Sequence, residues 1–413
     1  MEKRAKGLIL GDRIIWVVIV FLSFISLIEV YSSIGKAAYD HGWSISATVV
    51  KHVVIVVVSY ILMIGISHVP FKWFSGMSKL GFWLCLIMMG VMAVIAVSGK
   101  ITGTADGHAA SRWLDNIPII GQFQPSEIAK FVLLIFLARQ ISKYRDSLKD
   151  RDTFKKLILP VGVISALIFP ENFSTAALVF FSCLVLMYVG GVNKKYLLWT
   201  LAVVVALVVV FLLCSFVFKL SVFRSETWVN RINDWLNSDK DAITQTNIAK
   251  IAIASGGLPG VGIGNTVQGR YLNESHTDFI YSVITEEMGL VWVVLIIAAY
   301  IIFFIRCMSV SRNCDSFFGQ LAVAGLGFII TFQAMINMGV ATGYLPVTGQ
   351  TLPLVSYGGT SYVLTCCAIG VILSVSNHNN KKKRLAQQQD VKIEQSETED
   401  TNTENNTQNE SDN

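Results

Sequence analysis

Three short segments hold most of the polar residues that could do chemistry in this apolar sequence. The first runs from Arg112-Trp113 to the run QPSEIAK, which contains Glu127 and Lys130. Residues three apart share one face of a helix, so Glu127 and Lys130 should lie side by side. Arg112 and Lys130 could contact an anionic ligand at a membrane surface. Alternatively, Glu127 and Lys130 neutralise each other, and Arg112 with Trp113 anchors the chain at the membrane interface.

The second segment is glycine-rich and ends at an aspartate. The run SGGLPGVGIGN covers residues 255–265, and HTDF follows at 276–279. Glycines let the backbone approach a ligand closely and offer N–H groups to an anion. No strand precedes the run, which excludes a dinucleotide-binding fingerprint. On a helix, Asp278, Ser282 and Thr285 share one face, predicting a polar stripe inside a helix bundle. Alternatively, Asp278 is only an N-cap.

The third segment, residues 345–361, reads LPVTGQTLPLVSYGGTS. Hydroxyl residues such as Ser356 stand beside the adjacent glycines Gly358 and Gly359. The pattern predicts a broken or re-entrant helix, which membrane proteins tolerate where the break lines a cavity. Close helix packing through small residues is the alternative.

The elements that position these residues follow from composition. Of the 413 residues, 53% are hydrophobic and 15% are charged, against roughly 25% charged in an average soluble protein. Apolar runs of this length predict transmembrane helices. We therefore expect an all-α polytopic membrane protein with about ten spans, at 14–34, 47–68, 80–98, 124–141, 156–170, 173–191, 196–219, 278–305, 316–341 and 352–376.

The distribution of basic residues predicts the orientation of the spans. Most of the 33 Lys and Arg residues fall on the side of the N-terminus, which places both termini in the cytoplasm. All three polar segments then face outward, and residues about 220–277 form a large extracytoplasmic loop. Residues 1–376 form the membrane domain. Residues 377–413 start with a basic cluster and contain no aromatic residue, predicting a disordered cytoplasmic tail.

The ordered combination of motifs resembles the SEDS family (shape, elongation, division and sporulation proteins). It consists of Arg112-Trp113 with QPSEIAK, then SGGLPGVGIGN, HTDFIYSVITEEMG, and LPVTG followed by TLPLVSYGGTS, within residues 10–376. The GVGIGN form and the Thr-Leu-Pro of the last block look more like the cell-division branch than the elongation branch. The resemblance implies a SEDS-type helix bundle in the cytoplasmic (inner) membrane, with its active site facing outward.

The resemblance also implies an activity. The family polymerises lipid II, an undecaprenyl-pyrophosphate-linked disaccharide-pentapeptide, into peptidoglycan strands. For the cell-division branch this is septal synthesis, together with a class B penicillin-binding protein and other divisome proteins; no nucleic acid is involved. Asp278 matches the family's essential acidic residue, Glu127 and Lys130 a polar pair lining the same cavity, and Trp113 a position needed for activity. The matching motifs make His276, Ser356 and Gly358 further candidates for substrate binding.

These residue types suit the reaction. The acceptor hydroxyl must lose a proton while it attacks the donor sugar, and Asp278 is the candidate general base. The leaving pyrophosphate needs cations and N–H donors, for which Arg112, Lys130, Arg270 and the glycine-rich loop are candidates. We expect inversion of the anomeric centre. Mg²⁺ or Mn²⁺ could share the pyrophosphate, although no loop shows a metal-ligand pattern, and the seven cysteines show no metal-site or disulfide spacing.

Three alternatives differ in their predicted features. A lipid II flippase would need a polar site near the membrane midplane that opens to both faces, whereas the polar segments here gather on one side. An elongation-type polymerase of the same family would share the site and differ in partner. A scaffold without chemistry would leave the Asp278 stripe without a purpose.

Overall fold

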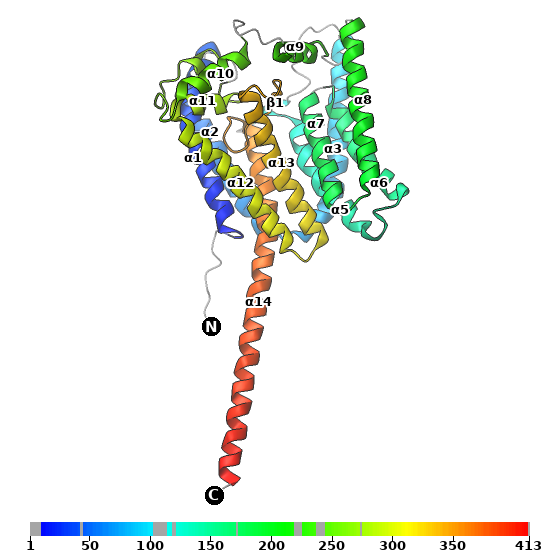
Figure 1. The fold of residues 1–413 in the computed structure, drawn as a ribbon, viewed down its shortest axis with the longest axis vertical. Coiled ribbons are helices and arrows are strands. Elements are labelled where there is room, and N and C mark those ends of the chain that lie inside the picture. The colour runs from blue at the N-terminus through cyan, green and yellow to red at the C-terminus, as the bar shows by residue number, and fades with distance from the viewer. Residues whose placement is uncertain are drawn as a thin grey trace.

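The predicted spans form a bundle of long helices (Figure 1). The computed structural model describes residues 10–41, 44–101, 114–117, 121–170, 172–218, 225–236, 244–272 and 275–411. All ten predicted runs contain a helix: α1 (Arg13–His41), α2 (Ile45–His68), α3 (Lys72–Ile101), α5 (Pro125–Lys143), α6 (Arg151–Ile168), α7 (Phe173–Val189), α8 (Lys194–Phe218), α12 (Leu290–Arg312), α13 (Phe317–Ala341) and α14 (Gly359–Ser411). Seven of the described helices are long and apolar enough to cross a membrane. The prediction of an all-α polytopic membrane protein is confirmed.

Burial distinguishes the centre of the bundle from its edge. In the apolar windows of α13 and α14, 78% and 83% of residues are buried, whereas in α8 only 6% are. The core therefore lies along α13 and α14, and α8 stands at the periphery with its apolar side chains outward. The polar residues of α13 consequently lie deep inside the protein, where they need protein partners.

The predicted span at 278–305 is not one helix, and this is a correction. A short helix, α11 (Ile280–Met288), ends at Gly289, and α12 starts at the next residue. Gly289 has φ of 82°, and a Cβ there would lie 2.3 Å from the carbonyl oxygen of Leu258. Only glycine fits such a left-handed conformation without strain. Asp278 precedes α11 in a turn at residues 275–279, so the predicted stripe on one continuous helix is wrong at its first residue.

The last predicted span, at 352–376, also begins later than expected. Residues 345–358 are non-helical, and α14 starts at Gly359. Leu354 has φ of 64° and is buried, a backbone conformation that costs a non-glycine residue about 1–3 kcal/mol. The preceding residue, Pro353, is held in place, because the Tyr300 hydroxyl donates to its carbonyl oxygen at 2.5 Å. The expected interruption of the helix is therefore an irregular segment in front of it.

Short elements cover one end of the bundle. The predicted loop at 220–277 contains α9 (Ser225–Leu236), α10 (Gln245–Gly256) and the 3-10 turn η2 (Gln268–Arg270). Figure 1 shows α9 lying across this end. Arg231 and Trp235 of α9 donate to the carbonyl oxygens of Val347 and Gly343, at 3.1 and 3.0 Å. The remaining elements are a hairpin, β1 (Leu114–Ile117) with β2 (Gly121–Phe123), and a 3-10 turn, η1 (Arg145–Ser147).

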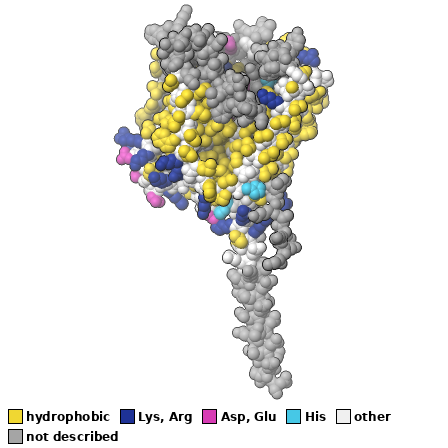
Figure 2. Space-filling model, turned by 180° about the vertical axis from the view of Figure 1, so that it is seen from behind, with side chains coloured by type: hydrophobic (Ala, Val, Ile, Leu, Met, Phe, Trp, Pro, Cys, Tyr) yellow, Lys and Arg dark blue, Asp and Glu magenta, His cyan; other side chains and the backbone are white. Residues whose placement is uncertain are grey.

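At the opposite end of the bundle, residues 11–12 lie beside the part of α14 that leaves the bundle and beside the end of α12. The Asn380 amide donates to the carbonyl oxygen of Gly11 at 3.2 Å, and Arg306 pairs with Asp12. Asp315 pairs with Lys382, whose hydrogen bond and charge lower the pKa of that carboxyl. Lys and Arg side chains gather mainly at this end, below an apolar band (Figure 2). This agrees with both termini lying on one side; that the side is cytoplasmic stays a prediction.

The fold continues α14 beyond the bundle. The helix runs to Ser411, through the segment predicted to be a disordered tail, and its side chains from 381 to 389 are exposed. A polar helix without packing partners gains little stability from its surroundings. The division of the chain at residue 376 stays a prediction.

Candidate active site

Asp278 lies on a turn whose backbone accepts hydrogen bonds from neighbouring elements. The Asn337 amide of α13 donates to the carbonyl oxygen of Asp278 at 2.8 Å. The side chain of Asp278 is half-buried, and a Cβ on Gly349 would lie 3.5 Å from its Oδ2. The carboxylate therefore lies beside the segment 345–353, next to a residue that leaves it room.

The two residues before Asp278 are fixed in the same way. The Ser356 hydroxyl donates to the carbonyl oxygen of Thr277 at 2.6 Å and accepts from the N–H of Leu352. The N–H of Tyr357 donates to the carbonyl oxygen of His276 at 2.9 Å, and their rings lie 5.7 Å apart. Burial raises the pKa of the Tyr357 phenol, which keeps it a neutral hydroxyl. His276 and Ser356 thus meet at the Asp278 turn, as predicted, through backbone contacts.

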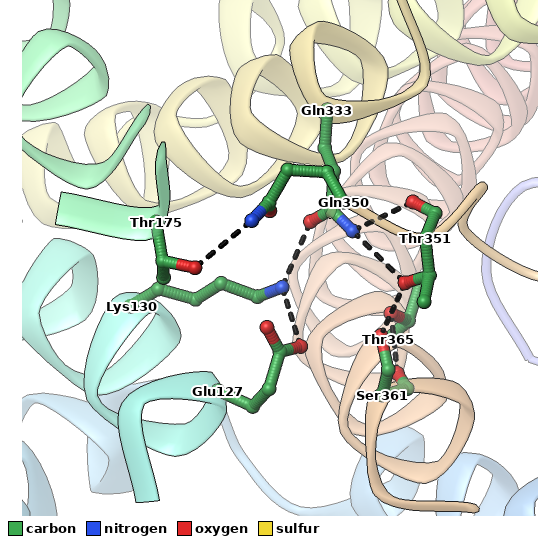
Figure 3. A network of polar contacts seen from close by, with 8 residues as sticks. All are labelled: Glu127, Lys130, Thr175, Gln333, Gln350, Thr351, Ser361 and Thr365. Atoms are coloured by element: carbon green, nitrogen blue, oxygen red, sulfur yellow. Dashed lines mark hydrogen bonds and ion pairs between the residues drawn. The ribbon is translucent and has the colours of Figure 1, made fainter. Parts of the chain in front are cut away.

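Glu127 and Lys130 form a buried pair in the first turns of α5. Their side chains are joined at 2.6 Å, with 10% and 0% exposure. Lys130 also donates to Gln333 of α13 at 2.8 Å, and Gln333 donates to the carbonyl oxygen of Thr351 at 2.9 Å (Figure 3). The ammonium charge is already matched within the protein. This geometry favours the structural alternative for the pair, because a phosphate contact would require the pair to open.

Amide side chains connect this pair to the Asp278 turn. Asn337, which anchors Asp278, also donates to the carbonyl oxygen of Gln350 at 2.7 Å. The Gln350 amide donates to the hydroxyl of Thr175 at 2.9 Å, next to the N-cap of α7 (Figure 3). Gln333, Asn337 and Gln350 therefore join α5, α7, α13 and the segment 345–353 around one polar centre.

Gln333, Gln350 and Thr175 were not among the predicted site residues. A signal for Gln333 existed, because it stands four residues before Asn337 in an apolar run, on the same helix face. Buried amides in a span require partners. For Gln350 and Thr175 nothing local indicated the pairing, since 175 residues separate the two.

The glycine-rich loop does not offer its N–H groups to a ligand as predicted. Glu286 accepts hydrogen bonds from the N–H groups of Val267, Gln268 and Gly269, at 2.9, 2.9 and 3.2 Å. Glu287 accepts from the N–H of Gly264 at 3.1 Å. Of these donors only Gly264 belongs to the run 255–265, whose Gly260 and Gly262 N–H groups donate to the carbonyl oxygens of Gly256 and Glu287. The N–H groups of these glycines therefore bond within the protein, which corrects the prediction that they face an anion. The residues that follow the run form a cradle of N–H groups around Glu286.

The glycines serve close packing between the loop and α11. A Cβ on Gly256 would lie 2.0 Å from the carbonyl oxygen of Thr285, and one on Gly260 would lie 2.1 Å from that of Glu287. The loop backbone is also bonded to α11, since Val261 and Gly262 donate to the carbonyl oxygens of Glu286 and Glu287. The sequence required glycine here for backbone contact within the protein.

Gly256→Ala is expected to lower the thermal stability of the purified protein, by about 1–3 kcal/mol in unfolding free energy, because the methyl group overpacks against α11. Gly162→Ala is the matched control: Gly162 also lies in a helix, α6, and has nothing within 4 Å of an added Cβ. It adds a methyl group without a packing conflict. Equal melting temperatures for the two variants would contradict the packing role of Gly256.

The remaining predicted site residues divide into three groups. Arg112 and Trp113 lie outside the described residues. Arg270 lies on η2 and is exposed, and it forms no ion pair with any residue that the structure describes. Gly358 ends the irregular segment, and its carbonyl oxygen accepts from Tyr362 in the first turn of α14. The structure therefore gathers Glu127, Lys130, His276, Asp278 and Ser356 around one network, with Gly358 at its edge.

Known proteins match this arrangement. The sequence profile of the FtsW/RodA/SpoVE family, described as cell cycle protein, matches residues 12–381. The chain belongs to this family. A probable peptidoglycan glycosyltransferase FtsW from Coxiella burnetii is 31% identical over 370 residues, covering 87% of this chain and 95% of that protein. The peptidoglycan glycosyltransferase MrdB of Escherichia coli K12 is 30% identical, covering 77% and 82%.

Solved structures share the fold. A chain from a study of polymerisation and crosslinking by a peptidoglycan synthase complex superposes with a TM-score of 0.68 at 24% identity, covering 89% of this chain and 98% of that one. The rod-shape-determining protein RodA of Thermus thermophilus gives 0.58 at 24% identity, covering 89% and 96%. At this identity the structures establish the architecture alone.

Proposed function

We propose that this protein is an inverting peptidoglycan glycosyltransferase that polymerises lipid II during septal wall synthesis. Family membership and relatives bearing that activity in their names support the reaction class. The observation that carries the proposal is the Asp278 turn. The half-buried Asp278 lies on a turn whose backbone is held at residues 276, 277 and 278 by Tyr357, Ser356 and Asn337.

In the proposed reaction, Asp278 removes the proton from the 4-hydroxyl of the acceptor sugar while that oxygen attacks the donor's anomeric carbon. A positioned general base typically contributes about 10²–10⁴-fold to a rate. The bond to pyrophosphate breaks as the new glycosidic bond forms, on the opposite face, so the centre inverts. Undecaprenyl pyrophosphate leaves as a stable anion and needs no second carboxylic acid, unlike the leaving group of a glycosidase.

Unsatisfied polar atoms beside this centre support a polar substrate. Within the described residues, six residues near the site each have one buried side-chain atom without a hydrogen-bond partner: Gln124, Ser126, Ser174, Ser282, Asn337 and Thr348. Buried polar groups without partners are costly. Sugar hydroxyls and amides carry the complementary donors and acceptors, so a small opening of the site would satisfy both sides.

Fewer residues are available to contact the pyrophosphate than the sequence suggested. Lys130 is paired and the glycines of the loop bond within the protein, so Arg270 and Arg112 are the proposed cationic contacts. The described part of the chain contains no group of three or more His, Cys, Asp or Glu residues that could hold a metal. A Mg²⁺ or Mn²⁺ ion shared with the pyrophosphate would need only one or two protein carboxylates, so it stays a proposal, and we route no step through it.

The proposed setting is the cytoplasmic membrane, with the Asp278 end facing outward. The clustering of basic side chains at the other end supports this orientation. The proposed partners are a class B penicillin-binding protein, which would crosslink the strands, and other divisome proteins. The shared fold with a chain of a peptidoglycan synthase complex supports the first of these.

The test is polymerisation of lipid II by the purified protein, alone and co-purified with its transpeptidase, with penicillin added to block crosslinking. We expect glycan strands on gels and release of undecaprenyl pyrophosphate. In detergent there are no two compartments, so a flippase would leave lipid II unchanged. Unchanged lipid II in both preparations would overturn the proposal.

A further inference from the structure

Three glutamates meet where α1 packs against α11, away from the polar network around Lys130. Glu29 of α1 is 0% exposed, and Glu286 and Glu287 of α11 are each 1% exposed. Buried carboxylates must be neutralised or supplied with donors. The proposed reaction uses none of the three, so their chemistry requires a separate explanation.

The acceptor positions of Glu286 are all filled. Its Oε1 accepts from two N–H groups, and its Oε2 accepts from the N–H of Gly269 and from the Thr266 hydroxyl. Four hydrogen bonds fill the lone-pair positions of a carboxylate. Glu286 therefore has no room to accept another hydrogen bond.

Glu287 is only partly satisfied. Its Oε1 accepts from the Ser32 hydroxyl at 2.5 Å and its Oε2 from the N–H of Gly264 at 3.1 Å. A backbone hydrogen bond from Thr266 adds to these, so one of the four acceptor positions of the carboxylate remains. A hydrogen-bond donor beside Glu287 would therefore find an acceptor.

Glu29 is the buried side chain that could donate a hydrogen bond to Glu287. Neither of its carboxyl oxygens has a hydrogen-bond partner among the described residues. It lies three residues before Ser32 on α1, so the two side chains share the helix face that contacts Glu287. Glu29 and Glu287 interact electrostatically. The nearby His52 of α2 is bonded to Ser26, not to Glu29.

We propose that Glu29 is a neutral carboxylic acid whose O–H donates to the carboxylate of Glu287, and that this bond makes Glu29 a positioning residue for Asp278. Two ionised carboxylates at this buried site would repel each other, and one shared proton removes the repulsion. The described residues provide no third ligand for a metal. A proton is the cation that fits.

Helix α1 connects Glu29 to Asp278, because α1 contacts the chain on both sides of Asp278. The Ser275 hydroxyl donates to the carbonyl oxygen of Ser33 at 3.5 Å, and Ser32 donates to Glu287. Asp278 lies between these contacts. Loss of the Glu29 bond leaves a buried acceptor of α11 unpaired and loosens the contact of α11 with α1. Small displacements of a catalytic group reduce rates strongly.

The experiment compares Glu29→Gln with Glu29→Ala in the full chain co-purified with its transpeptidase. The proposal rests on the proposed function, so lipid II turnover is the first readout. Gln donates an N–H in place of the O–H, and we expect its kcat within about threefold of the parent. We expect Ala to lower kcat by roughly 10-fold or more, with KM for lipid II nearly unchanged. Ser23→Ala is the matched control on α1, because Ser23 is buried and bonded to Tyr60 and Tyr362 instead.

A loss of turnover in the Gln variant equal to that in Ala would overturn the proposal, because it would show that the charge of Glu29 is needed. Full activity in Ala would overturn it too. Amide hydrogen exchange over residues 280–288 gives a second readout. We expect faster exchange in Ala than in Gln, and this readout stands even if lipid II is not the substrate. If the Glu29→Ala protein does not accumulate, the turnover of Glu29→Gln compared with that of the parent protein decides the test.

Discussion

Asp278→Asn is expected to lower the rate of glycan polymerisation by roughly 10²–10⁴-fold, the usual contribution of a general base. The amide is almost the same size as the carboxylate but cannot take a proton. The backbone contacts that place residue 278 come from Asn337 and, through Thr277, from Ser356, and they do not involve the side chain. The variant should therefore fold normally.

Initial rates of strand formation with lipid II measure the effect, and the melting temperature checks the fold. Asp315→Asn is the matched control, the same chemical change at an exposed position near the other end of the bundle. Polymerisation at the parental rate by Asp278→Asn would remove the base from the mechanism.

Lys130→Ala is expected to lower the unfolding free energy by about 3–5 kcal/mol, because it leaves the Glu127 carboxylate buried and unpaired. Lys130 is 0% exposed and has no other role visible in the network than to satisfy Glu127 and Gln333. The loss of stability is measured by heating the protein in detergent and following the folded fraction by size-exclusion chromatography.

The double variant Glu127→Gln/Lys130→Met separates stability from catalysis. It removes both charges at similar volume, so we expect most of the stability to return. If turnover returns with it, the pair is structural. A stable double variant without turnover would instead restore Lys130 as a cationic contact to the substrate.

Apolar length predicted the ten helical runs well, because a membrane span needs little more than about 20 apolar residues. The break at Gly289 escaped the same logic. Apolar residues continue on both sides of it, and the reason for the break lies in the loop backbone around Leu258, which contacts Gly289 from 31 residues earlier. Hydropathy carries no information about such a contact.

The sequence predicted which residues meet at the site better than it predicted what each of them does there. Glu127, Lys130, His276, Asp278 and Ser356 do meet, but several contribute through backbone contacts or internal pairing. The glycines illustrate why. A glycine is required equally for a ligand's approach and for the approach of another backbone, and the sequence alone cannot separate the two. The two adjacent acids Glu286 and Glu287, about 20 residues after the glycine-rich run, were a signal for contact within the protein.

The cradle around Glu286 has a consequence for competing anions. A carboxylate tethered to its own binding loop acts at an effective concentration of order millimolar or more, and it cannot diffuse away. Dissolved phosphate or released undecaprenyl pyrophosphate would have to displace this resident carboxylate. We therefore expect these N–H groups to bind such anions weakly.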